Sequence, residues 1–114
     1  MREITVSTAV NEAIAEEMRR DETIFLIGED VAEAGTPFKI TSGLVEEFGT
    51  DRVIDTPISE PGFMGIAVGA AMTGSRPIVD LMFGDCIFLI MDQLFNQAAN
   101  THYISGGKLN VPLD

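Results

Sequence analysis

Three short segments of the sequence place chemically useful side chains at the ends of apolar runs. Glu29 follows TIFLIG, Glu60 follows RVIDTPIS, and Met82 lies near the end of PIVDLMF. If these runs are neighbouring parallel strands, their carboxyl ends meet at one edge of a sheet, where open α/β proteins bind their ligands. This topology therefore brings two acids to one edge, where they could hold a bound molecule.

Each acid also has an interpretation that needs no ligand. Glu29 and Asp30 are adjacent acids after a predicted strand, and such residues are commonly solvated in a loop. Glu60 directly precedes a helix that is predicted to begin near Pro61, and an acid there stabilises the positive end of the helix dipole by roughly 0.3–1 kcal/mol. On spacing alone, these two interpretations are favoured.

Other kinds of site find little support. The chain has one histidine, His102, and one cysteine, Cys86, so no zinc-ligand spacing and no disulfide framework is present. His102 lies near the end of a predicted helix, where a structural role is favoured. Ser59 lacks a GxSxG motif, and the glycines at 62–69 do not form the GxGxxG turn of a dinucleotide site.

The composition indicates a soluble protein with a strongly acidic surface. The formal charge is −11, from 18 acidic and 7 basic residues. This balance argues against nucleic acid or an anionic membrane as a partner, since both require clustered lysine and arginine. The sequence also lacks the roughly 18 consecutive apolar residues of a membrane span. A single cysteine within an apolar run favours a reducing, cytoplasmic compartment.

The periodicity of apolar residues predicts strands that alternate with helices. Helices are expected at 7–20, 44–49, 61–72 and 85–103, strands at 23–28, 52–55 and 77–83, a loop at 29–43, and the beginning of a further strand at 109–114. The helix at 61–72 is apolar on nearly all sides and rich in glycine and alanine, so we expect it to be buried. Alternation of this kind predicts an α/β fold with a parallel sheet, as one domain over residues 1–114.

Long stretches of the chain resemble a known family. They are GEDVAEAG at 28–35, FKITSGLVEEFG at 38–49, RVIDTPISEPGFMGIAVGAAMTGSRPIVDLMF at 52–83, and MDQLFNQAANTHYISGG at 91–107. These stretches closely resemble the β subunit of the E1 component of 2-oxo acid dehydrogenase complexes. The resemblance runs over practically the whole chain.

This resemblance implies a fold and a function. The fold is the three-layer, transketolase-like pyrimidine-binding domain, here expected to be truncated because the chain corresponds to about the first third of such a subunit. The cofactor is thiamin diphosphate, whose diphosphate is held with Mg²⁺ by a partner E1 α subunit, and the acyl product passes to the lipoyl arm of E2. Alone, the chain is expected to be inactive and to form homo-oligomers. The alternative is a non-enzymatic binding or scaffold protein that has kept the fold.

The resemblance also assigns roles to residues. Glu60 matches the catalytic glutamate that hydrogen-bonds N1′ of the aminopyrimidine ring, and Glu29 matches a glutamate near the cofactor. Ile58 and Met82 match apolar residues around the ring. Cys86 occupies a cofactor-binding position that is usually aromatic, so a large flat contact is missing there. His102 replaces a common arginine, with a structural role or one at a subunit contact expected.

Overall fold

The centre of the fold is a sheet of three parallel strands. In the computed structural model of the protein, which describes residues 2–113, the strands are β1 (Ile24–Gly28), β2 (Val53–Asp55) and β3 (Arg76–Asp80). Their order is β2-β1-β3, so β1 pairs with both neighbours. β1 is almost entirely buried, as expected of an apolar strand in a parallel sheet covered on both faces. The predicted α/β fold with a parallel sheet is confirmed.

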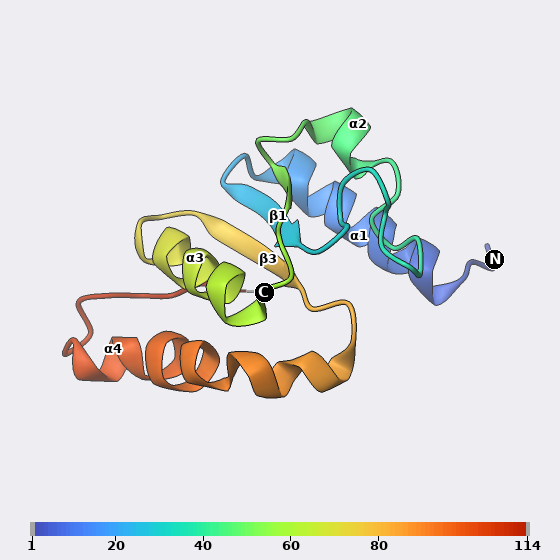
Figure 1. Ribbon diagram of the computed structural model, residues 1–114. Coiled ribbons are helices and arrows are strands. Elements are labelled where there is room, and N and C mark those ends of the chain that lie inside the picture. Colours follow the sequence, from blue (N-terminus) through green and yellow to red (C-terminus); the bar gives the residue numbers. More distant parts are fainter. Residues whose placement is uncertain (1, 114) are drawn as a thin grey trace.

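Helices cover both faces of this sheet (Figure 1). They are α1 (Val6–Arg20), α2 (Leu44–Phe48), α3 (Glu60–Met72), the 3₁₀ helix η1 (Gly84–Ile90), the π-helix η2 (Asp92–Ala99) and α4 (Asn100–Ile104). The predicted loop at 29–43 contains neither helix nor strand. Within residues 2–113, none of the helices has the length and apolar character required to cross a membrane.

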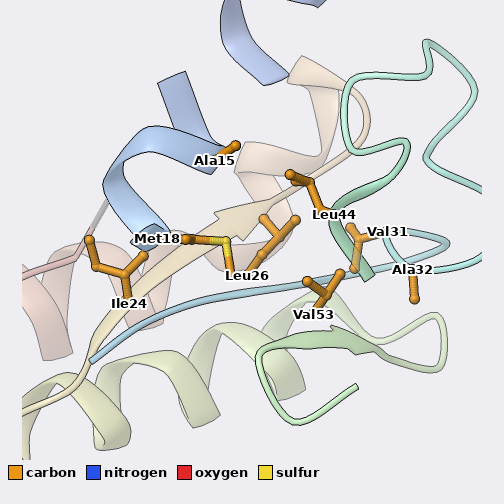
Figure 2. Close-up of a cluster of buried hydrophobic side chains, with 8 residues drawn as sticks. All are labelled: Ala15, Met18, Ile24, Leu26, Val31, Ala32, Leu44 and Val53. Atoms are coloured by element: carbon orange, nitrogen blue, oxygen red, sulfur yellow. The ribbon is translucent and has the colours of Figure 1, made fainter. Parts of the chain in front are cut away.

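The apolar core lies on the two faces of β1. On one face, a cluster joins α1, α2, β1, β2 and the first part of the 29–43 loop (Figure 2). Its buried members are Ala15, Met18, Ile24, Leu26, Val31, Ala32, Leu44 and Val53. On the other face, Ile27 packs against Phe63 and Ala67 of α3. The side chains of β1 therefore alternate between two helical layers, as the pleat of a strand requires.

Arg52 joins the elements of the first face just before β2. Its guanidinium donates hydrogen bonds to the carbonyl oxygens of Met18 and Ile24, both at 2.7 Å, and of Asp21 at 3.0 Å. The same group lies over the Phe48 ring, 5.2 Å from its centroid. One side chain thus ties together the end of α1, the start of β1 and the end of α2.

Three sequence-based expectations were wrong in detail. β3 ends at Asp80 and not at 83, because the chain turns sharply at Met82. Residues 109–113 form no strand, although Leu113 packs beside the buried clusters on α3. The helix α3 is buried on one side only, and Ile66 on its other side is 61% exposed.

The predicted single helix at 85–103 is three helical pieces of different pitch. Ile90, Leu94 and Ala98 pack against Met64 and Val68 of α3. These three residues are four positions apart, whereas an α-helix turns once every 3.6 residues. Ile90 belongs to η1, and Leu94 and Ala98 belong to the π-helix η2. The segment therefore packs along α3 although its pitch changes.

Candidate functional site

The sheet brings the predicted site segments to one edge. Glu29 directly follows β1, Glu60 opens α3 after β2, and Met82 lies two residues beyond the end of β3. The three strands are parallel, so these positions all lie at the carboxyl edge. The convergence inferred from the alternation of elements is thus present in the fold.

Gly28 permits the close approach of β1 and β3 at this edge. A Cβ atom at position 28 would lie 2.5 Å from the carbonyl oxygen of Asp80 and 3.1 Å from the Asp80 Cβ. Real side chains do not tolerate the first of these separations, and the atom met is backbone. Glycine at this position therefore allows the segments after β1 and β3 to lie side by side.

Glu29 is a half-buried acid with an unused acceptor. Among the described residues, its Oε1 atom is buried and has no hydrogen-bond partner. Burial raises the pKa of the Glu29 carboxyl, and the negative charges of Glu60 and Asp30 raise it further, against a smaller opposing effect of a hydrogen bond from the Ser59 backbone. Glu29 and Glu60 are thus close enough to interact electrostatically.

Glu60 lies near the single thiol of the chain, Cys86. It is half-buried in the first turn of α3, where the N-terminal Ser59 provides no side-chain cap. Burial raises the pKa of the Cys86 thiol, and the neighbouring carboxylates of Glu60 and Glu29 raise it further. Glu60, Glu29 and Cys86 therefore form one interacting group, and Glu60 also occupies the position favoured by the helix dipole.

Met82 occupies a strained turn. Its φ is +62°, in the left-handed region that a residue with a side chain rarely adopts. The Phe83 N–H donates to the Leu81 carbonyl oxygen at 2.6 Å, which closes a three-residue turn around Met82. The Met82 N–H donates to Asp80 Oδ1, also at 2.6 Å. Strain of this kind clusters at functional sites.

Ile58 lies on the segment between β2 and α3 and is 84% exposed, so its side chain is open to a ligand or to another chain. Beside this segment is an apolar hollow of about 400 Å³. It is lined by Ile27, Ile54, Asp55, Thr56, Pro57, Ser59, Gly62, Phe63 and Ile66. The hydroxyl oxygen of Thr56 is buried and unpartnered in the described chain. Two of the lining residues, Pro57 and Ser59, flank Ile58, and Ser59 directly precedes Glu60.

Two residues of the site were missed by the sequence reasoning. The Asp80 side chain accepts the Met82 N–H and so holds the turn. The only sign of this contact in the sequence was an aspartate two residues before Met82, a spacing at which its side chain can accept a backbone N–H. Phe38 meets Phe83 edge to face, with ring centroids 6.0 Å apart. No local pattern predicts that contact, because the two rings come from distant loops.

The residues set aside as structural remain outside this group. His102 Nδ1 lies 3.0 Å from the Leu109 carbonyl oxygen and donates to it in the tautomer that carries the proton on Nδ1. This contact fastens the segment after α4 and gives His102 a structural role. No cluster of three or more metal-ligating side chains was found among residues 2–113.

Comparison with known proteins identifies the family to which the chain is similar. Residues 2–113 match the family described as transketolase, pyrimidine binding domain. The β subunit of the pyruvate dehydrogenase E1 component of Rhizobium meliloti (strain 1021) is 50% identical over 113 residues, which cover 99% of this chain and 25% of that protein.

Two mitochondrial relatives give the same picture. The β subunits of the pyruvate dehydrogenase E1 component from Dictyostelium discoideum and from Homo sapiens are each 49% identical, over 98% and 97% of this chain. The chain spans 32% and 31% of their lengths, so it corresponds to less than a third of each. The resemblance to E1 β subunits is confirmed.

Proposed function

Because the chain belongs to the family of transketolase pyrimidine-binding domains, we propose that it supplies the aminopyrimidine half of a thiamin diphosphate site in an E1 β subunit. The family depends on thiamin diphosphate. The observation that carries the proposal is the position of Glu60 at the start of α3, beside Glu29 and the Cys86 thiol at the carboxyl edge of the sheet. Pyruvate, named in the relatives, is the proposed 2-oxo acid of the complete enzyme.

The residues present fit the pyrimidine half of this cofactor. An aminopyrimidine carries ring nitrogens and an exocyclic amine around a flat apolar ring. Glu60 offers a carboxyl group for a ring nitrogen, and the buried, unpartnered Oε1 of Glu29 offers an acceptor near it. Met82 and the exposed Ile58 offer apolar surface. Unpartnered polar atoms beside apolar side chains are typical of small-molecule sites.

The proposed chemistry of the chain centres on Glu60. When bound, thiamin diphosphate supplies the nucleophilic ring carbon that attacks the 2-oxo group. Glu60 would offer its carboxyl group to N1′ of the pyrimidine, and Glu29, whose pKa is raised by burial and by the charge of Glu60, would lie beside it. Cys86, which lies near both carboxylates, would form part of the surroundings of Glu60.

The proposed partners are those of an E1 β subunit. An E1 α subunit would hold the diphosphate and Mg²⁺, and an E2 component would receive the acyl group on its lipoyl arm. In the absence of the α subunit we expect no decarboxylation. We further propose that the isolated chain self-associates through its exposed apolar side chains. The cytoplasmic location stays a prediction from composition.

The test is a titration of the 114-residue chain with thiamin diphosphate and magnesium, followed by NMR, which detects even millimolar affinities. Glu60→Gln is expected to weaken binding by roughly 10- to 150-fold, since hydrogen bonds to charged groups contribute about 1.5–3 kcal/mol. Glu46→Gln, an exposed change on α2, serves as the control and should bind like the wild type. Equal binding by the wild type and Glu60→Gln would remove the role assigned to Glu60. Failure of the wild type to bind would favour the scaffold alternative.

A further inference from the structure

Two aspartates end the outer strands of the sheet in matching positions. Asp55 of β2 and Asp80 of β3 are both in register with Gly28 of β1. Each side chain accepts a backbone N–H at the carboxyl edge: Asp55 Oδ1 from Ala32 at 2.8 Å, and Asp80 Oδ1 from Met82 at 2.6 Å. The two carboxylates therefore hold the two loops that carry the candidate site residues Glu29 and Met82.

The two loops differ in how much they depend on the aspartate. Ala32 has an ordinary φ, whereas Met82 has a φ of +62° in a three-residue turn. In that turn the Cβ of an L residue is crowded by its own backbone, so the conformation is unfavourable unless the surroundings impose it. Asp80 supplies a charge-assisted hydrogen bond to the N–H of the strained residue itself.

Asp80 is in turn held by the sheet. The absence of a Cβ at Gly28 lets β1 lie directly against the Asp80 backbone, where a methyl group would be 2.5 Å from the carbonyl oxygen. Beyond the turn, Phe83 packs edge to face against Phe38, at an interplanar angle of 76°. The strained residue thus lies between an anchor on the sheet and an aromatic contact with the 29–43 loop.

We propose that Asp80 is the positioning residue for Met82: its carboxylate holds residue 82 in the left-handed turn and so fixes the Met82 side chain at the carboxyl edge of the sheet. The functional value of this position rests on the proposed function, in which Met82 packs against the pyrimidine ring. The effect of Asp80 on the conformation of Met82 can be measured in this chain without any ligand.

The first test measures the turn in the free chain by NMR. The one-bond Cα–Hα coupling and the backbone carbon shifts of Met82 distinguish a positive φ from a negative one, and a ¹³C-methyl label reports the position of its side chain. Asp80→Ala is expected to lose the positive-φ signature and to shift the Met82 methyl signal. Asp80→Asn, which keeps an oxygen acceptor, is expected to retain both. An unchanged Met82 signature in Asp80→Ala would overturn the proposal.

The second test is a double-mutant cycle on unfolding. Met82→Gly removes the side chain that makes a positive φ costly, so Asp80→Ala is expected to destabilise that background less than it destabilises the wild type. Asp55→Ala is the matched control: it removes a similar hydrogen bond at the same edge and should cost the same in both backgrounds. Additive effects of Asp80→Ala and Met82→Gly would contradict the proposal.

The third test connects the turn to binding, with thiamin diphosphate and magnesium as the probe. If Met82 packs against the ring, Asp80→Ala weakens binding by roughly tenfold, the change that about 1.4 kcal/mol produces, and Asp80→Asn restores most of it. If the wild type binds nothing, the proposed function fails, while the first two tests still decide the conformational claim. If Asp80→Ala loses the turn and binds normally, the positioning role in binding is overturned.

Discussion

Glu29, Glu60 and Cys86 illustrate how neighbours alter the chemistry of single side chains. Two carboxylates beside each other at a half-buried edge cannot both carry full charge without cost, and the raised pKa of Glu29 expresses this. Burial and the same two acids raise the pKa of the Cys86 thiol, which disfavours the reactive thiolate form.

The raised pKa of Glu29 leads to a prediction about stability and pH. An acid whose pKa is higher in the folded state binds its proton more tightly there. It therefore favours folding below its ordinary pKa, and this contribution is lost as the pH rises through the raised value. Glu29→Gln removes the ionisation. Its stability relative to the wild type is expected to increase from pH 4 to pH 7, as measured by urea denaturation.

Glu46→Gln again provides the control, because Glu46 is exposed on α2. This variant should follow the pH dependence of the wild type. A Glu29→Gln chain that tracks the wild type at every pH would show that Glu29 ionises in the folded chain as easily as in the unfolded one.

Among the elements, β1 determines where the site lies. It pairs with both other strands, its side chains contribute to the buried clusters on both faces, and its last residue, Gly28, faces Asp55 and Asp80 in register. The candidate site forms where this strand ends, because the loops after all three strands emerge together at that point.

Gly28→Ala is expected to destabilise the chain by about 1–3 kcal/mol, the usual cost of overpacking. The added methyl group would lie 2.5 Å from the Asp80 carbonyl oxygen, so β1 and β3 must separate to admit it. Chemical denaturation measures the change in the free energy of unfolding, and the Met82 signals described above should move as well.

Gly69→Ala is a control of opposite sign. Gly69 lies inside α3, where an added Cβ meets nothing within 4 Å. Alanine in a helix interior is favoured over glycine by roughly 0.5–1 kcal/mol, so this variant should be more stable than the wild type. If Gly28→Ala were equally stabilising, the close approach of the two strands would not constrain position 28.

The whole molecule combines a strongly acidic composition with an exposed apolar surface on its helical segment 84–104. In this segment Phe88 is 78% exposed, Phe95 59% and Tyr103 87%. Large apolar side chains gathered on one segment are typical of surfaces that contact another chain. The charge of −11 opposes association of identical copies at low salt, since like charges repel.

We expect the isolated chain to associate in a concentration-dependent way, more strongly as salt screens its charge. Phe88→Gln is expected to weaken association by roughly tenfold or more, because burial of a phenylalanine side chain contributes about 1.5–3 kcal/mol. Sedimentation velocity over a range of concentrations measures this. Val6→Gln, at a residue that is 82% exposed on α1, is the control. A compact monomer at every concentration and salt would contradict the prediction.

The order of elements and the approximate place of the site follow from local patterns in the sequence. Strand β1 is a short apolar run ended by glycine, α1 is amphipathic, and Glu29 and Glu60 lie just beyond predicted strands. Such patterns carry this information because backbone periodicity is a property of neighbouring residues. The roles of Glu29 and Glu60 toward a cofactor came from resemblance to a family and stay a prediction.

Other features became visible only when distant segments were brought together. The strained turn at Met82 depends on Asp80, whose backbone lies against Gly28 of another strand. The proximity of Cys86 to Glu60 depends on η1 packing against α3, and Leu94 and Ala98 of η2 pack against the same helix. Apart from the hydrogen bond between Asp80 and Met82, no window of neighbouring residues encodes these contacts, because each joins two elements that are remote in the chain.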